Sequence, residues 1–126
     1  MNVLVLDDEE IVLFYFKTFL GTMNVSTKTT SSVDEALEII HSGWVDLLIT
    51  DIKMPEMSGF DLIDKIRKEG HNFMIIVESG YLENDERMQF YKDNVFAFIP
   101  KPIDLNNLES VMDQAIKVYQ SSSSIS

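Results

Sequence analysis

The sequence has no cysteine, and among its 126 residues it has only two histidines, His41 and His71. Without cysteine the chain forms no disulfide, and it offers no thiolate as a nucleophile or as a ligand for zinc or an iron–sulfur cluster. Two isolated histidines are also too few for a histidine-rich metal site. The chemistry of this chain therefore has to come from other side chains.

Positive charge is scarce as well, with 10 Lys and Arg residues against 21 Asp and Glu residues and a net charge of −11. Such a chain is repelled by nucleic acid and by anionic membranes, so we expect neither as a direct partner. No stretch approaches the roughly 20 apolar residues that span a bilayer, and the N-terminus lacks the basic region of a signal peptide. We expect a soluble, cytoplasmic protein.

What the sequence does have is 45% hydrophobic residues, arranged as short apolar runs that alternate with segments of helical periodicity. The alternation predicts an α/β fold, a doubly wound and mostly parallel five-stranded sheet with five helices. The predicted strands cover residues 3–6, 24–29, 45–50, 73–77 and 95–99, and the predicted helices cover 8–20, 32–43, 58–70, 84–93 and 104–119. Residues 1–120 are expected to form one domain, and the serine-rich residues 121–126 a disordered tail.

Polar side chains stand where four of the predicted strands end, and in open α/β sheets ligands bind at that edge. Asp7 and Asp8 follow the first strand, Asp51 the third, Ser79 the fourth and Lys101 the fifth. Taken singly, each has a structural explanation as a helix cap, a turn residue or a surface charge. Taken together, like charges crowded at one edge repel each other unless a cation neutralises them.

Oxygen ligands with access to water favour a hard cation, and Mg²⁺ is the cation we expect. A carboxylate next to Mg²⁺, a hydroxyl and a lysine is an arrangement that accepts a phosphoryl group, with the carboxylate as nucleophile. The metal and the ammonium group would offset charge on the phosphoryl oxygens. The residues alone therefore point to phosphoryl transfer.

Four sequence pieces carry a resemblance to a known family. They are Leu4-Val5-Leu6-Asp7-Asp8-Glu9, Asp51-Ile52-Lys53-Met54-Pro55-Glu56-Met57-Ser58-Gly59, Ser79-Gly80 and Phe98-Ile99-Pro100-Lys101-Pro102. With these pieces in order and at matching spacing, the chain resembles the receiver domain of two-component response regulators over residues 2–119. The resemblance implies a flavodoxin-like sheet with strand order 2-1-3-4-5.

The resemblance also implies a role for each residue of the site. Asp51 would be the phosphoacceptor. Asp7 and Asp8 would hold Mg²⁺ together with Asp51 and the backbone carbonyl of Lys53. Lys101 would pair with the phosphoryl group.

A conformational switch is implied in the same way. The Ser79 hydroxyl would move toward the phosphoryl group, and Phe98 would rotate inward behind it. Phe98 lacks the hydroxyl of the more frequent tyrosine, so it would act by packing. The switch would alter the surface formed by the helix over 84–93 and the strand and helix that follow. The Lys101–Pro102 bond would be cis.

The predicted function is a phosphorylation-activated signalling switch. The donor would be a sensor histidine kinase or a histidine phosphotransfer protein, and the target a downstream output protein or domain. The chain would be no enzyme, although it would assist its own phosphorylation and dephosphorylation, as a monomer or a phosphorylation-dependent dimer. A stand-alone regulator, a phosphorelay shuttle and part of a longer regulator all fit.

Three other functions are less consistent with the sequence. A flavin-binding electron carrier needs a phosphate-binding loop where residues 7–10 are all acidic. A metal-dependent phosphatase needs a cap domain to enclose its substrate. A degenerate receiver that only binds partners would not need the complete acidic set and Lys101.

Glu78, Lys53 and Tyr81 remain open. Glu78 ends an otherwise apolar strand, either facing solvent or altering the local charge. Lys53 and Tyr81 flank the predicted pocket, either as loop surface or as residues that tune hydrolysis of the acyl phosphate.

Overall fold

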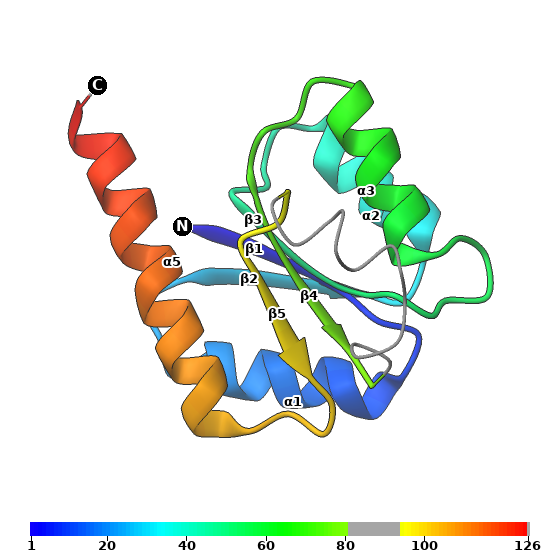
Figure 1. The fold of residues 1–126 in the computed structure, drawn as a ribbon, viewed down its shortest axis with the longest axis horizontal. Helices are drawn as coiled ribbons and strands as arrows, with labels where there is room; N and C mark the ends of the chain where they lie inside the picture. The colour runs from blue at the N-terminus through cyan, green and yellow to red at the C-terminus, as the bar shows by residue number, and fades with distance from the viewer. Residues whose placement is uncertain (81–93, 126) are drawn as a thin grey trace.

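The computed structural model describes residues 1–80 and 94–125. A central sheet of five parallel strands carries helices on both faces (Figure 1). The strands are β1 (Asn2–Leu6), β2 (Ser26–Thr30), β3 (Leu47–Asp51), β4 (Met74–Ser79) and β5 (Ala97–Pro100). The helices are α1 (Glu10–Leu20), α2 (Val33–His41), α3 (Gly59–Lys68) and α5 (Leu105–Ile125).

The strand order β2-β1-β3-β4-β5 confirms the predicted order, and every neighbouring pair is parallel. The described residues contain four helices. The fifth predicted helix, over 84–93, lies outside the described residues. No described helix has both the length and the apolar character needed to cross a membrane.

Two hydrophobic cores lie on opposite faces of the sheet, because successive side chains of a strand point to opposite sides. Val3 and Val5 of β1 belong to the core under α1 and α5, whereas Leu4 and Leu6 belong to the core under α2 and α3. All four side chains are fully buried. The continuous apolar run of β1 is therefore the pattern of a strand covered on both faces.

Serine side chains begin two of the helices at the predicted places. Ser32 Oγ accepts a hydrogen bond from Glu35 N at 3.2 Å, and Ser58 Oγ accepts one from Asp61 N at 3.1 Å. Each bond satisfies a backbone N–H that has no partner within the first helical turn. The second serine matters most for the site, because it begins α3 directly after the loop that follows β3.

The last helix is longer than predicted. It continues to Ile125, whereas the sequence predicts an end at Tyr119 and a disordered tail from residue 121. Each residue added to an existing helix gains a backbone hydrogen bond, and serine is only mildly unfavourable in a helix. The serines over 121–124 therefore extend α5, which projects beyond the sheet (Figure 1).

Arg67, near the end of α3, ties three segments together at the edge where the strands begin. Its Nη1 atom donates to the carbonyl oxygens of His71 at 2.8 Å and Phe73 at 2.9 Å, and Nη2 donates to that of Asn94 at 3.4 Å. The guanidinium group offers several donors in a fixed plane, so one side chain serves all three carbonyls. The start of β4 and the approach to β5 are thereby held next to α3.

Candidate functional site

Four ionisable side chains form a row at the carboxyl edge of the sheet. Asp7 follows β1, Asp51 ends β3, Glu78 is the penultimate residue of β4, and Lys101 follows β5. The register pairs Asp51 with Glu78, so these two residues lie side by side on neighbouring strands. Side chains alternate along each strand, which places the row on the face covered by α1 and α5.

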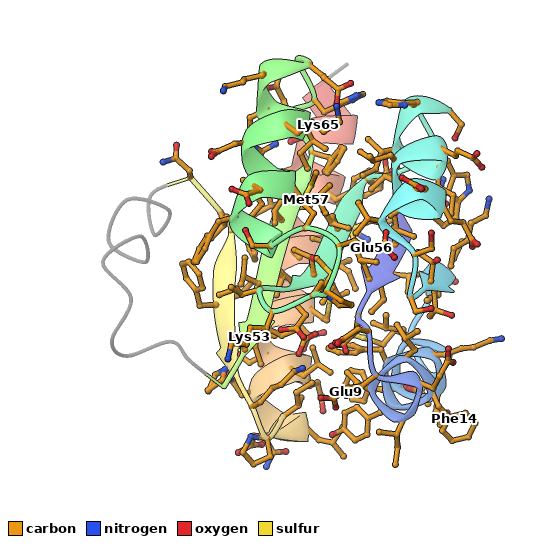
Figure 2. The ribbon with its side chains drawn as sticks, turned by 90° about the vertical axis from the view of Figure 1, so that its right-hand side faces the viewer. Glu9, Phe14, Lys53, Glu56, Met57 and Lys65 are labelled. Carbon is orange, nitrogen blue, oxygen red and sulfur yellow. The ribbon has the colours of Figure 1, made fainter. Side chains whose placement is uncertain are left out.

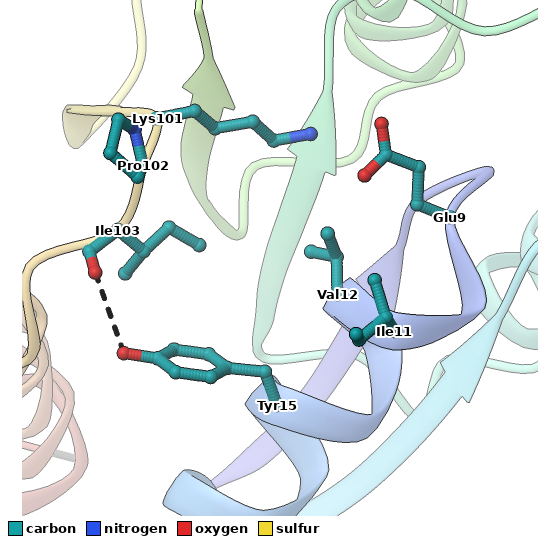
Figure 3. A pocket seen from close by; sticks show the side chains of 7 residues that line it. All are labelled: Glu9, Ile11, Val12, Tyr15, Lys101, Pro102 and Ile103. Atoms are coloured by element: carbon teal, nitrogen blue, oxygen red, sulfur yellow. Dashed lines mark hydrogen bonds between the residues drawn. The ribbon is translucent and has the colours of Figure 1, made fainter.

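Lys101 is at the centre of this row. Its Nζ atom lies 3.1 Å from Asp7 Oδ2, 3.3 Å from Asp51 Oδ2 and 3.2 Å from Glu78 Oε2. The contacts to Asp7 and Asp51 are hydrogen bonds. The lysine side chain extends from the loop after β5 across the edge of the sheet (Figure 3). The predicted meeting of Asp7, Asp51 and Lys101 is therefore found in the structure.

Backbone N–H groups fix the two aspartates in place. Asp51 Oδ1 accepts hydrogen bonds from Ile52 N at 2.7 Å and from Lys53 N at 3.4 Å, and Asp7 Oδ1 accepts one from Glu9 N at 2.8 Å. Burial raises the pKa of Asp51 and the charge of Asp7 adds to the rise, while Lys101 and the Ile52 N–H act in the opposite direction. Asp51 is thus a carboxyl group held by two backbone N–H groups, with a pKa above its ordinary value.

Three aspartates at this edge offer only oxygen atoms as ligands. Asp7, Asp8 and Asp51 each offer a carboxylate oxygen, and the three oxygens lie within 4.8 Å of one another. Asp7 and Asp51 are buried, while Asp8 is exposed and gives the site access to water. Oxygen-only ligands with room for water suit a small hard cation. The loops that carry Glu9 and Lys53 flank this edge (Figure 2).

Glu78 does not face solvent, which answers a question that the sequence left open. It is fully buried, and neither carboxylate oxygen has a hydrogen bond within the described chain. Burial, together with the charges of Asp7 and Asp51, raises the pKa of Glu78 to about 10 against the opposing charge of Lys101. Glu78 is therefore a neutral carboxylic acid at neutral pH.

The same cluster favours the charged form of Lys101, whereas it favours the neutral form of Glu78. Burial opposes the charge on its ammonium group, but the carboxyl groups of Glu78, Asp7 and Asp51 together raise the pKa of Lys101 above its ordinary value. The lysine therefore stays charged at any physiological pH. Sequence reasoning left the role of Glu78 open, although Glu78 lies two residues after the buried Ile76 and so on the same face of β4.

Ser79 and Phe98, the two predicted switch residues, lie on neighbouring strands. Ser79 is the buried last residue of β4, and its carbonyl oxygen accepts a hydrogen bond from Lys101 N at 3.1 Å. Phe98 is half-buried in β5 and packs against the core under α2 and α3, on the face opposite the acidic row. The Lys101–Pro102 peptide bond is cis, as the resemblance implies.

Gly59, the first residue of α3, packs directly against the end of β3. Its N–H donates to the Ile52 carbonyl oxygen at 2.8 Å. A Cβ atom at this position would collide with the Asp51 carbonyl oxygen and lie 2.9 Å from Ile52 Cα. Only glycine lets α3 start this close to Asp51.

An apolar pocket of about 540 Å³ opens beside the site, between α1 and the loop that leads to α5 (Figure 3). Glu9 and Lys101 border it on the side of the site, and Tyr15 donates a hydrogen bond to the Ile103 carbonyl oxygen at 3.5 Å. Ile11, which also lines the pocket, is 76% exposed, and Phe14 on the same helix is 71% exposed. An apolar surface thus adjoins the acidic edge.

Comparisons with known proteins agree with this geometry. The sequence matches the family described as "Response regulator receiver domain" over residues 3–113. It is 30% identical over 115 residues to the response regulator protein PilR of Pseudomonas aeruginosa, covering 91% of this chain and 26% of the relative. It is 32% identical over 118 residues to the sensor kinase CckA of Brucella abortus, covering 92% of this chain and 12% of the relative.

The solved structures give the same result. The crystal structure of a response regulator receiver domain protein from Clostridium thermocellum superposes with a TM-score of 0.82 and 30% sequence identity, and the match covers 94% of this chain and 96% of that one. The curated relatives are much longer, and the chain spans about a quarter of PilR. By the family match and the shared fold together, this chain belongs to the response regulator receiver domains of two-component systems.

Proposed function

We propose that this chain is a phosphorylation-controlled signalling switch that accepts a phosphoryl group on Asp51. The observation that supports the proposal is the position of Asp51. Its carboxylate accepts a hydrogen bond from Lys101, and it lies close enough to the carboxylates of Asp7 and Asp8 for one cation to bind all three. A cation and an ammonium group on either side of a carboxylate are suited to offset the charge of an incoming phosphoryl group.

The transfer would join one oxygen of Asp51 to phosphorus. A phosphohistidine on the donor would lose its P–N bond at the same time, and the imidazole would leave with the electron pair of that bond. The product on Asp51 would be an acyl phosphate. Hydrolysis of the C–O–P linkage by water would return the carboxylate and release inorganic phosphate.

Mg²⁺ is the cation that the donor set fits. Asp7, Asp8, Asp51 and the Lys53 carbonyl oxygen would hold it, and its charge would make the approach of a phosphoryl group to three carboxylates favourable. Asp7 and Asp51 keep their backbone hydrogen bonds in place, so the ligands need little reorganisation to receive the ion.

Ser79 and Phe98 would carry the signal away from the site. The Ser79 hydroxyl would bond a phosphoryl oxygen, and Phe98 would turn toward the space that this movement opens. Support comes from their neighbouring strands and from the partial burial of Phe98. The surface that would change includes β5 and α5, together with residues 84–93, which lie outside the described chain.

A sensor histidine kinase or a histidine phosphotransfer protein is the donor that fits this surface. A donor has to bring its phosphohistidine into contact with Asp51, so it must also cover the surface around the site. Ile11 lines the pocket beside the site, and Phe14, three residues further along α1, is exposed as well. Their burial by a donor would contribute to binding.

Acetyl phosphate with Mg²⁺ tests the acceptor without a protein donor. The purified chain should gain the mass of one phosphoryl group, and Asp51→Asn should gain none. Asp61→Asn, which changes an exposed aspartate in the first turn of α3, is the matched control and should be labelled like the wild type. Labelling of Asp51→Asn to the wild-type extent would refute the proposal.

A further inference from the structure

One lysine serves three carboxyl groups at the acceptor edge, and the proposed function uses only two of them. Lys101 Nζ lies 3.2 Å from Glu78 Oε2, as close as it lies to Asp7 and Asp51. An ammonium group has three N–H donors. The third carboxyl group therefore takes a share of the same charge that a phosphoryl group would need.

Glu78 is separate from the cation site. The three carboxylate oxygens that lie within 4.8 Å of one another belong to Asp7, Asp8 and Asp51, and Glu78 is not in that group. It lies instead between β3 and β5, where the register pairs it with Asp51 on one side and Ile99 on the other. Its contact with the site is therefore through Lys101.

Burial keeps the Glu78 side chain beside Lys101. The side chain is fully buried, and within the described chain neither of its oxygens has a hydrogen bond. A buried polar group without a partner costs free energy, so the Lys101 contact is one that the fold retains strongly. With 0% of its surface exposed, the side chain does not reach water.

We propose that Glu78 is a positioning residue for Lys101. Glu78 holds the Lys101 ammonium group on the β4 side of Asp51, so a phosphoryl group on Asp51 has to compete with Glu78 for that ammonium group. The inference rests on the proposed function of Asp51 and concerns the regulation of the same site. It accounts for an acidic residue in the middle of the buried row, where an apolar one would pack without cost.

The competition predicts a direction. When Asp51 carries a phosphoryl group, Lys101 loses its contact with the free carboxylate and gains phosphoryl oxygens as partners. Glu78 remains beside the lysine and keeps part of its hydrogen-bonding capacity. Removing the Glu78 oxygens should therefore tighten the binding of a phosphoryl group, while an amide at this position should not, since it keeps an oxygen that can face Lys101.

Beryllofluoride with Mg²⁺, an inorganic mimic of a phosphoryl group on a carboxylate, tests this prediction by titration calorimetry. We expect Glu78→Leu to bind it about tenfold more tightly than the wild type, and Glu78→Gln to bind it as the wild type does. Glu78→Met serves as a second apolar variant should leucine disturb the core. Equal or weaker binding by the apolar variants would overturn the proposal, as would tighter binding by Glu78→Gln.

A second readout does not require a loaded site. The ¹H and ¹³C signals of the Lys101 ε-methylene group, assigned with Lys101→Arg, should shift in Glu78→Leu and stay close to their wild-type positions in Glu78→Gln. Unchanged signals in Glu78→Leu would overturn the proposal. Failure of the acceptor function would look different, because wild-type protein would then bind no beryllofluoride while the Lys101 signals still separated the two variants.

Discussion

Lys101 brings one positive charge to three carboxyl groups, two of which are fully buried. A proton on Glu78 reduces the remaining imbalance, and the raised pKa of about 10 shows how strongly the buried site favours that neutral form. Negative charge at this edge is therefore offset by the ammonium group of Lys101 and reduced by the proton on Glu78.

The state of Glu78 predicts how stability depends on pH. Its pKa is raised on folding, so above pH 5 the unfolded chain releases a proton that the folded chain keeps, and stability falls as pH rises toward 10. Glu78→Gln removes this contribution. In EDTA, the free energy of unfolding of Glu78→Gln should rise relative to that of the wild type by up to about 1.4 kcal/mol for each unit by which the pH is raised.

Urea unfolding at pH 5, 6, 7 and 8 measures this difference. Titrations of all other groups occur in both proteins and largely cancel when the two curves are subtracted. A constant gap between wild type and Glu78→Gln across this range would contradict a neutral, buried Glu78.

At the scale of elements, the end of β3 and the start of α3 pack closely against each other because residue 59 is glycine. The N–H of Gly59, at the start of the helix, donates a hydrogen bond to the Ile52 carbonyl oxygen. The Asp51 backbone occupies the space that a side chain at position 59 would need. The same contact sets the path of the loop that carries Lys53. The packing of a helix start thereby determines where the loop after Asp51 can lie.

Gly59→Ala should destabilise the protein by about 1–3 kcal/mol, because the added methyl group meets backbone atoms that have no room to move. It should also lower labelling of Asp51 by acetyl phosphate. Gly80→Ala is the matched control, since a Cβ atom there meets nothing within 4 Å. Thermal unfolding of both variants measures the difference. A loss of stability in Gly80→Ala but not in Gly59→Ala would argue against this account.

For the whole molecule, a net charge of −11 means that any divalent cation stabilises the fold to some extent by screening. A specific Mg²⁺ site adds a saturable effect that depends on its ligands. At about ten times its Kd, Mg²⁺ should raise the free energy of unfolding by about 1.4 kcal/mol, which corresponds to roughly 5 °C in Tm.

Scanning calorimetry at constant ionic strength, set with NaCl, separates the two effects. Asp8→Asn should lose the saturable rise, while Glu10→Gln, which removes an exposed acid from the adjacent first turn of α1, should keep it. An equal response of the two variants to Mg²⁺ would mean that the ion acts through general screening.

Much of the fold follows from local patterns. Buried parallel strands such as β1 have continuous apolar runs, and the serines before α2 and α3 mark helix starts by chemistry that is visible in the sequence. The strand order was predicted from the resemblance and is confirmed. The end of α5 was not predicted, because composition alone does not show whether a serine run continues an existing helix.

The site divides in the same way. Asp7, Asp51 and Lys101 meet because parallel strands end at a common edge, so their convergence was predictable from strand assignments alone. The burial of Glu78 depends on the register between β3, β4 and β5, which no local pattern specifies. The roles of Ser79, Phe98 and the Lys53 carbonyl stay predictions, since they concern a phosphorylated state.

The Arg67 hydrogen bonds have a consequence for the end of the sheet where the strands begin. Phe73 directly precedes β4, Asn94 lies shortly before β5, and one guanidinium group on α3 binds the carbonyl oxygens of both residues. The spacing of β4 and β5 where they begin is thereby set by a side chain outside the sheet as well as by the ladder between the two strands.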